Sequence, residues 1–217
     1  VLLPNEQIYP VDSQLSWAEL AAIPETYYTA FGSFKNMQIK EGDSILVRAA
    51  TSGVGLAFLK LVKAQFPQNR VVGSVRSLAK KDLLQQQGFD EIILDERGVL
   101  QTEEKFDKIL ELVGPATLKN SFDHIQSAGI ICNTGQLGGK WYVEEFDPIV
   151  EIRNNSYLTS FYSGNVHQQL IDELFSYIDA YKINVSPQRI FSLEQIPAAH
   201  SYIESQAGFG KVVVLNN

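Results

Sequence analysis

The sequence predicts a doubly wound α/β fold, in which a mostly parallel sheet carries helices on both faces. Two observations predict it. Short apolar runs alternate with segments of helical period between residues 42 and 163, and the first run ends in a turn of small residues, AATSGVG, that opens a helix. Strands that alternate with helices are joined by right-handed crossovers and form parallel sheets covered on both sides. A chain of 217 residues that is 45% hydrophobic is long enough to bury such a core.

Each element is assigned from its local pattern, in chain order. Two short helices are expected between residues 16 and 34, separated at Pro24, because proline cannot continue a helix interior. Six apolar runs are expected to be strands, at residues 44–50, 70–75, 91–95, 106–113, 129–135 and 157–163. The helices between them are expected at residues 53–66, 77–88 and 115–129, the last two ending at Gly88 and Gly129.

The C-terminal part continues this alternation. A long amphipathic helix is expected at residues 165–183, because apolar residues recur there with helical spacing, at Leu170, Leu174, Ile178 and Tyr181. A strand, a helix and a strand should follow, with Ser192 and Gln195 in the capping-box arrangement at the helix start. We therefore divide the chain into a connector at 1–24, a dinucleotide-binding domain at 25–182 and a C-terminal segment at 183–217. The start at Val1, without Met, suggests a piece of a longer polypeptide.

Composition argues against several kinds of partner. The net charge is -7 and the Lys and Arg residues form no block, so neither a nucleic-acid surface nor an anionic membrane face is expected. No apolar run reaches the roughly 18 residues that a membrane span needs, and no signal peptide is visible. The single cysteine, Cys132, excludes an internal disulfide and a multi-cysteine metal site, which favours a reducing cytoplasm.

The turn after the first strand has the shape of a phosphate-binding site. In dinucleotide folds a turn of small residues lets backbone N–H groups at a helix N-terminus approach a pyrophosphate. In the G-x-G-x-x-G frame, Ala50 and Ser52 stand where the first two glycines would be, and Gly55 takes the third place. The motif is degenerate, but strand, turn, helix and second strand come in the order that a nucleotide site requires.

The end of the second strand indicates which nucleotide would bind. NAD sites place an Asp or Glu about 20 residues beyond the turn, where its carboxylate binds the ribose hydroxyls. Here the sequence reads GSVRSLAKKD, with Val75 in the acid's place and Arg76, Lys80 and Lys81 beside it. Because cations attract a 2′-phosphate, the pattern favours NADP(H). The alternative is that these cations are the solvated start of a helix, a position that the helix dipole disfavours for lysine.

Other chemistries fit the sequence less well. Three histidines, His124, His167 and His200, fall on separate predicted helices without Cys or acidic partners at ligand spacing, so no zinc is expected. Ser52 precedes a glycine but lacks the glycine two residues earlier that a nucleophile elbow needs, which argues against a serine hydrolase. A Rossmann-type methyltransferase would need an acid at the end of the second strand. A cofactor-binding or sensing module without catalysis is the other alternative.

Together these features resemble the quinone oxidoreductase branch, with zinc-free, zeta-crystallin-like enzymes, of the medium-chain dehydrogenase/reductase superfamily. The resemblance covers nearly the whole chain. It rests on stretches that occur in the family's order, namely PETYYTA, IKEGDSILVRAATSGVGLAFLKLVKA, VGSVRSLAK, QGFDEII, ELVG, NTGQLGG and GKVVVLN. It implies a Rossmann-type domain with a short remnant of an N-terminal GroES-like catalytic domain. The whole enzyme would transfer hydride from NADPH to a quinone, enone or similar conjugated carbonyl, and the chain alone would bind NADPH but turn over poorly.

The resemblance also implies which residues bind the cofactor. The residues at the nicotinamide or pyrophosphate would be Thr29, Ser52, Gly53, Val54, Gly55, Thr134, Gly135, Gln136, Phe161 and Tyr162. Those at the adenosine and its 2′-phosphate would be Ser74, Arg76, Ser77, Lys80, Leu112, Val113 and Gly114. No catalytic residue and no metal ligand is assigned. The strand between Ser156 and Ser163 would pair across a two-fold axis in a homodimer.

The chain departs from some relatives at two places. Asp95 or Glu96 stands where those relatives have an aromatic residue, and Gln206 stands where they have an arginine. Both changes would weaken NADPH binding. Trp141 and Tyr142 lie in the loop GQLGGKWYVEEFDP, which follows the expected strand at residues 129–135. They would either face a substrate or pack on the surface.

Overall fold

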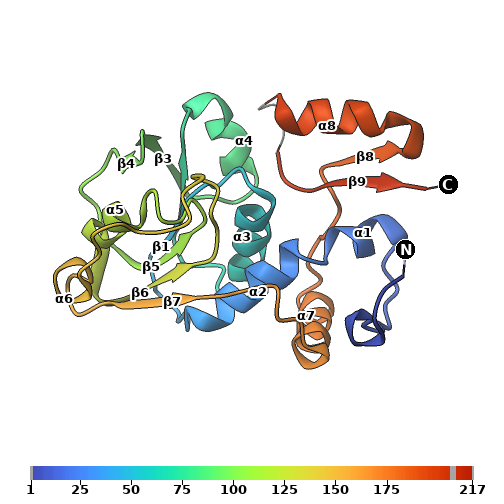
Figure 1. The fold of residues 1–217 in the computed structure, drawn as a ribbon, viewed down its shortest axis with the longest axis horizontal. Helices are drawn as coiled ribbons and strands as arrows, with labels where there is room; N and C mark the ends of the chain where they lie inside the picture. Colours follow the sequence, from blue (N-terminus) through green and yellow to red (C-terminus); the bar gives the residue numbers. More distant parts are fainter. Residues whose placement is uncertain (1, 206–208, 217) are drawn as a thin grey trace.

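One seven-stranded sheet organises the described part of the chain, residues 2–205 and 209–216, in this computed structural model. Every pair of neighbouring strands is parallel except β3 with β4. In sheet order the strands are β4 (Val99–Leu100), β3 (Glu91–Glu96), β2 (Val71–Val75), β1 (Ile45–Val47), β5 (Phe106–Glu111), β6 (Ile125–Asn133) and β7 (Tyr157–Ser160). Figure 1 shows this sheet at the centre of one half of the molecule, and it confirms the predicted fold class.

Helices connect the strands and continue beyond them. The α-helices are α1 (Trp17–Ala22), α2 (Thr26–Asn36), α3 (Gly53–Gln65), α4 (Lys81–Gln86), α5 (Leu118–Asp123), α6 (Pro148–Glu151), α7 (Gln168–Ala180) and α8 (Ile196–Glu204). Three short 3₁₀ helices are η1 (Asn5–Gln7), η2 (Leu78–Lys80) and η3 (Leu193–Gln195). The predicted break between two helices at Pro24 is confirmed, since α1 ends before it and α2 begins after it.

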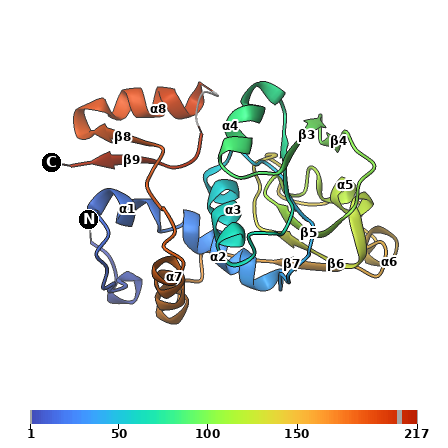
Figure 2. The same ribbon diagram turned by 180° about the vertical axis from the view of Figure 1, so that it is seen from behind.

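The sheet is buried on both faces because neighbouring residues of each strand point to opposite sides. Val47, Val71 and Leu110 belong to the core under α2, α3, α4 and α7. Their neighbours Leu46 and Val72 belong to the second core, which α5 covers with Leu118 and Phe122. Figure 2 shows α3 and α4 to one side of the strands and α5 to the other. Continuous apolar strands such as ILV and VVGSV are thereby explained, because a parallel sheet covered on both sides has no solvent face.

One predicted boundary is wrong. The helix expected to end at Gly129 ends at Asp123, and β6 already begins at Ile125. Phe106 pairs with Ile125 while Lys108 pairs with Ile130, so residues 126–129 form a bulge. A Cβ on Gly129 would lie 2.8 Å from the Ile125 side chain, and hence the glycine serves the bulge and is not a helix stop. The short strand β4 was not expected, and β7 is shorter than its apolar run.

The C-terminal segment forms a separate unit beside the sheet. It is built from β8 (Arg189–Ser192), η3, α8 and β9 (Val212–Leu215), and β8 pairs with β9 in parallel. The capping box is confirmed, since Gln195 Oε1 accepts a hydrogen bond of 3.0 Å from the backbone N–H of Ser192. The helix α1 lies against β9, as both views show, so the predicted connector and the C-terminal segment are neighbours. The division of the chain into three segments stays a prediction.

Candidate functional site

The turn after β1 forms a helix N-terminus with two unused donors. Ala49 adopts φ 63°, a left-handed conformation that costs free energy for a residue with a Cβ and turns the chain sharply out of the sheet. Ser52 then caps α3, since its Oγ accepts a hydrogen bond of 3.0 Å from the N–H of Gly55. Within the described residues, the N–H groups of Gly53 and Val54 have no acceptor. They are therefore available to an anionic ligand.

A cavity of about 580 Å³ lies on one side of this turn. Arg76, Ser77 and Lys80 line it from the loop after β2, together with Ser52 and Gly53 from the turn. Val75 is also among the lining residues, so the position where a ribose-binding acid would stand is apolar. Burial lowers the pKa of Lys80 from its ordinary value. The opposite wall comes from the C-terminal unit, with Ile203, Glu204, Phe209, Gly210 and Val212.

A second cavity, of about 380 Å³, lies on the other side of the same turn. Its wall combines Thr29 of α2 with Leu112 after β5 and Thr134 after β6. The remaining lining residues are Glu25, Thr26, Ser52, Gly53, Val54, Gly135, Gln136, Leu137, Ser163, Gly210 and Lys211. Thr29 is 5% exposed, and its Oγ1 is buried without a hydrogen-bond partner within the described chain. An unsatisfied buried hydroxyl is costly, so this atom points to a ligand group.

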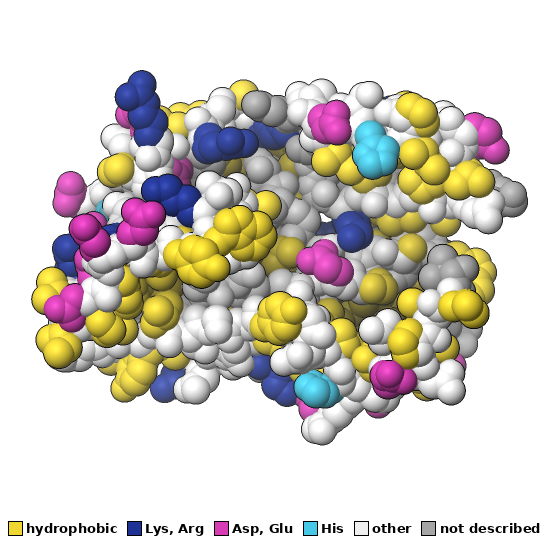
Figure 3. All heavy atoms as spheres, in the orientation of Figure 1, with side chains coloured by type: hydrophobic (Ala, Val, Ile, Leu, Met, Phe, Trp, Pro, Cys, Tyr) yellow, Lys and Arg dark blue, Asp and Glu magenta, His cyan; other side chains and the backbone are white. Residues whose placement is uncertain are grey.

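The two cavities form one path across the carboxyl ends of the strands. Ser52, Gly53 and Gly210 belong to both walls. Gly210 donates a backbone hydrogen bond of 3.3 Å to Thr51, which ties the C-terminal unit to the turn. Figure 3 shows the surface hollowed between the sheet and the C-terminal unit, with basic side chains beside the hollow. A long, anionic molecule could lie along this path with its centre at the N-terminus of α3.

Most residues expected to bind a cofactor line this path, and the rest have other positions. Thr29, Ser52, Gly53, Val54, Arg76, Ser77, Lys80, Thr134, Gly135 and Gln136 are among its lining residues. The described linings of the two cavities do not include Gly55, Ser74, Val113, Gly114, Phe161 or Tyr162. Ser74 is 1% exposed, and Tyr162 is 73% exposed. The role of each residue in cofactor binding stays a prediction.

Several of these residues have structural tasks that the sequence did not reveal. A Cβ on Gly55 would lie 3.0 Å from the carbonyl oxygen of Ala49, so the turn itself requires glycine there. Gly114 and Gly135 let two loops cross, because a Cβ on Gly135 would lie 2.2 Å from the Leu112 oxygen. Phe161 packs on α2, where a Cβ on Gly32 would lie 2.1 Å from its ring.

A buried ionic network lies beneath the site and was not expected from the sequence. Arg48, which follows β1, is 0% exposed and forms an ion pair with Asp95 at the end of β3. Its Nε lies 3.8 Å from Glu111 Oε2 at the end of β5. Its other hydrogen bonds go to Thr117, Asn120, Ser121 and Gly98. Asp95, which we expected to matter as a missing cofactor contact, therefore pairs with Arg48; Gln206 lies outside the described residues.

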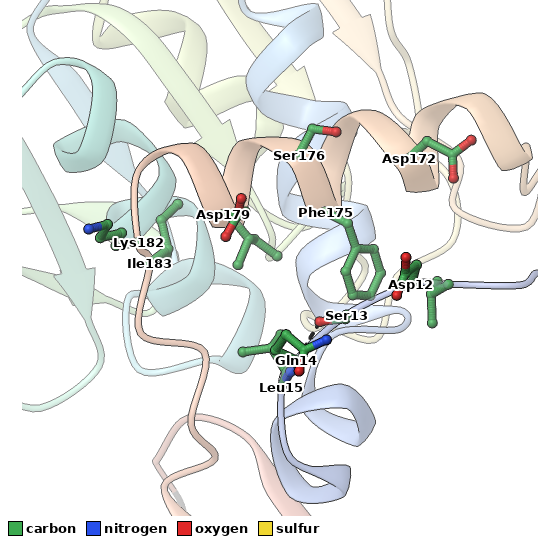
Figure 4. A pocket seen from close by; sticks show the side chains of 12 residues that line it. Asp12, Ser13, Gln14, Leu15, Asp172, Phe175, Ser176, Asp179, Lys182 and Ile183 are labelled. Atoms are coloured by element: carbon green, nitrogen blue, oxygen red, sulfur yellow. Dashed lines mark hydrogen bonds between the residues drawn. The ribbon is translucent and has the colours of Figure 1, made fainter.

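A third cavity, of about 690 Å³, lies elsewhere, between the N-terminal segment and α7. Figure 4 shows Phe175 projecting from α7 toward Asp12 and Ser13. Asp12, Asp172 and Asp179 line this cavity, and Lys182 is its cation among the described residues. Carboxylates repel phosphates, so this cavity is unsuited to a nucleotide.

Metal ligands do not gather in the described residues, where no group of three His, Cys, Asp or Glu could hold an ion. His124 is buried, and its Nδ1 lies 2.9 Å from the Glu104 carbonyl oxygen. Within residues 2–205 and 209–216, the side chains are therefore not arranged to hold zinc. Trp141 and Tyr142 are exposed, at 70% and 83%.

In the residues that the structure describes, no helix is long and apolar enough to cross a membrane.

The order of the strands and the small-residue turn after β1 define the class of this domain. The order β3-β2-β1-β5-β6-β7, with a small-residue turn after the central strand, is that of doubly wound dinucleotide-binding domains. Residues 87–214 match the profile of a family described as zinc-binding dehydrogenase. The chain belongs to this family, in the quinone oxidoreductase-like branch of the medium-chain dehydrogenase/reductase superfamily, and it corresponds to the NAD(P)-binding domain of these oxidoreductases. The family assignment by resemblance is thereby confirmed.

Curated relatives are longer than this chain. A probable polyketide synthase 14 of Dictyostelium discoideum is 23% identical over 100% of this chain and 8% of its own length. A 2-methylene-furan-3-one reductase of Solanum lycopersicum is 26% identical over 92% of this chain and 47% of its own. A probable quinone oxidoreductase of Schizosaccharomyces pombe is 24% identical over 82% of this chain and 56% of its own. The chain thus spans about half or less of each of these proteins.

Solved structures share the fold. The Bacillus subtilis protein yhfP with NAD bound is 22% identical, with a TM-score of 0.79 over 98% of this chain and 68% of its own. A mycobacterial protein complexed with NADPH is 21% identical, with a TM-score of 0.76 over 94% of this chain and 66% of its own. At these identities the likeness establishes the Rossmann-type architecture.

Proposed function

We propose that this chain binds NADP(H) along the path formed by the two cavities. In the whole protein, hydride would pass from NADPH to a quinone, enone or similar conjugated carbonyl. The observation that carries the proposal is the chemistry of the larger cavity. Arg76, Ser77 and Lys80 line it, and Val75 replaces the acid that NAD sites place there.

The electrostatics of this cavity favour a 2′-phosphate over a free hydroxyl. A phosphate between Arg76 and Lys80 gains charge-assisted hydrogen bonds of about 1.5 to 3 kcal/mol each. It would also raise the lowered pKa of Lys80, because a neighbouring anion stabilises the charged ammonium. Glu204, on the opposite wall, opposes the phosphate and moderates this preference.

Residues around the turn would hold the remaining parts of the cofactor. The free N–H groups of Gly53 and Val54 would bind the pyrophosphate at the positive end of α3. The smaller cavity is then left for the nicotinamide ring, with Leu112 as an apolar wall and the hydroxyls of Thr29 and Thr134 as polar groups. When bound, the cofactor supplies the hydride, and the protein supplies position and exclusion of water. No acid or base of this chain is needed for that transfer.

The substrate class rests on similarity to two reductases. Relatives of this chain bear the names 2-methylene-furan-3-one reductase and probable quinone oxidoreductase, and both names denote conjugated carbonyl substrates. The chain spans 47% and 56% of these proteins, so the substrate would be bound largely outside it. We expect the chain alone to bind NADPH without steady quinone reduction. Such reduction by the purified chain would contradict this expectation.

A cofactor-binding or sensing module without catalysis is the second candidate. The exposure of Trp141 and Tyr142 favours it, because neither ring is among the described linings of the two cavities, where it could close over a substrate. The two candidates differ in turnover by the longer protein that contains this domain: a reductase consumes NADPH with an enone or a quinone, whereas a sensing module binds NADPH without consuming it.

Paired calorimetric titrations of the chain with NADPH and NADH test the binding proposal. We expect NADPH to bind at least tenfold more tightly, a difference of about 1.4 kcal/mol. Arg76→Ala should remove this preference, while Lys81→Ala, on the adjacent helix and outside the described lining of the cavity, is the matched control. Equal affinity of the wild-type chain for both nucleotides would refute the assignment of Arg76 and Lys80.

We also propose a homodimer through β7 and a cytoplasmic location. β7 is the last strand of the sheet, and Tyr157 and Leu158 are exposed on it. An apolar edge strand without a cover promotes pairing with a second chain. Analytical ultracentrifugation of the chain should show dimers that Leu158→Lys separates. The single cysteine is compatible with a reducing compartment.

A further inference from the structure

A chain of buried hydrogen bonds runs from β6 into α2 behind the smaller cavity. The Ser33 hydroxyl lies 2.8 Å from the Thr29 carbonyl oxygen and 2.9 Å from Thr134 Oγ1. Cys132 Sγ lies 3.3 Å from the same Thr134 oxygen. Ser33 and Cys132 are fully buried, while Thr134 lines the cavity.

The direction of each hydrogen bond in this series follows from the group at its end, the Thr29 carbonyl oxygen. A carbonyl oxygen only accepts, so the Ser33 proton goes to Thr29. Ser33 must then accept from Thr134, because a hydroxyl has one proton to donate. The Thr134 proton is thereby used, and Thr134 must accept from the Cys132 thiol. Burial raises the pKa of that thiol, so it keeps its proton at neutral pH.

Thr134 therefore presents only a lone pair to the cavity. Thr29, which lines the same cavity, has a buried hydroxyl with no partner in the described chain, and this hydroxyl can donate. One acceptor and one donor on the wall of the same cavity match a primary carboxamide, whose NH₂ donates and whose oxygen accepts.

We propose that Ser33 is a positioning residue, which orients the Thr134 hydroxyl as an acceptor for the carboxamide N–H of the nicotinamide, while Thr29 donates to the carboxamide oxygen. This inference rests on the proposed cofactor. Ser33 acts only through Thr134, since the described lining of the cavity does not include it. The pair of hydroxyls thus distinguishes a carboxamide from groups that lack the N–H donor.

A cofactor analogue isolates this contact. The 3-acetylpyridine analogue of NADP⁺ keeps the carbonyl oxygen but replaces NH₂ with a methyl group. Because this methyl group cannot donate a hydrogen bond, the Thr134 lone pair has no partner when the analogue is bound. The wild-type chain should therefore bind NADP⁺ about tenfold more tightly than the analogue. Thr134→Val should reduce that ratio to about one. Thr29→Val should weaken both ligands alike, because both retain the oxygen.

Two further variants interrupt the hydrogen-bond chain on opposite sides of Thr134. Ser33→Ala removes the acceptor of the Thr134 proton, so the hydroxyl is free to turn its proton toward the cavity. The tenfold ratio should then fall to about two or less. Cys132→Ala leaves the Thr134 proton bound to Ser33 and should keep the ratio. A purely structural role of Ser33 would change both affinities together and leave the ratio unchanged.

The experiment is calorimetric titration of the wild-type chain and these variants with both ligands. Equal affinity of the wild-type chain for NADP⁺ and the analogue would overturn the carboxamide assignment while leaving the proposed cofactor intact. Binding of neither ligand would overturn both. If Ser33→Ala does not fold, the Thr134→Val and Cys132→Ala ratios decide, because the proposal requires the first to fall and the second to stay.

Discussion

Replacing Gly53 with alanine should separate the stability of the fold from the binding of the cofactor. A Cβ at this position would lie 3.5 Å from the Thr26 methyl group and 3.7 Å from the Gly210 backbone, which are ordinary contacts. Gly53 also lies at the start of α3 without a positive φ. Gly→Ala substitutions at such positions stabilise by about 0.4 to 1 kcal/mol, because the unfolded chain loses conformational freedom.

The cofactor should be affected in the opposite direction. Gly53 is a wall of both cavities, and its N–H is one of the two free donors at the helix start. A methyl group there keeps the pyrophosphate away from the backbone, with the loss of at least one charge-assisted hydrogen bond of about 1.5 to 3 kcal/mol. The NADPH dissociation constant should therefore rise about tenfold to a hundredfold.

Thermal unfolding and NADPH titration of the same sample measure both effects. Gly135→Ala is the contrasting variant, because its Cβ would lie 2.2 Å from the Leu112 oxygen and should destabilise the fold itself. An unchanged NADPH affinity of Gly53→Ala would refute the placement of the pyrophosphate at this turn. A large loss of stability in Gly53→Ala would refute the steric argument.

Three further predictions concern the buried network, the half-buried Lys60 and the opposing carboxylate Glu204. Arg48→Met should cost about 3 to 5 kcal/mol in urea unfolding, because Asp95 and Glu111 lose their buried partner. Arg70→Met, which removes two partly exposed ion pairs with Glu91 and Glu104, should cost about 1 kcal/mol or less, and equal costs would contradict this account. Burial lowers the pKa of Lys60 from 10.5, so the folded state releases the Lys60 proton at a lower pH than the unfolded state does. The free energy of unfolding therefore rises with pH between the lowered pKa and 10.5. The free energy of unfolding of Lys60→Met should lack this rise. Parallel pH profiles of the wild-type protein and Lys60→Met would exclude a contribution of Lys60 to the pH dependence. Glu204→Gln should tighten NADPH more than NADH, since only NADPH carries the 2′-phosphate that the carboxylate repels; an equal effect on both would place Glu204 away from that phosphate.

The sheet and the phosphate turn could be predicted because their signals are local. Apolar runs, helical spacing and the order of strand, turn and helix depend on neighbouring residues, and they located β1, α3 and β2. The bulge in β6 could not be predicted, since Gly129 ends an apparent helix in sequence but packs on Ile125 in space. A glycine signals backbone freedom without saying which structure uses it.

Contacts between distant segments were also beyond the sequence. Arg48, Asp95 and Glu111 each stand at the end of an apolar strand, where a charged residue indicates pairing without identifying its partner. The Ser33–Thr134 hydrogen bond joins a helix to a strand end, and no spacing rule relates the two. Likewise, the sequence indicated Arg76 and Lys80 but not the wall that the C-terminal unit adds opposite them.

That wall has a consequence for biosynthesis. Thr51 and Gly210, joined by a backbone hydrogen bond, are far apart in sequence, so Gly210 leaves the ribosome well after Thr51. Domains fold from the N-terminus as the chain emerges, so the sheet can assemble while the larger cavity still lacks one wall. Capture of the proposed cofactor would then wait for synthesis of β9, and a variant truncated before β9 would fold its sheet yet lose the nucleotide.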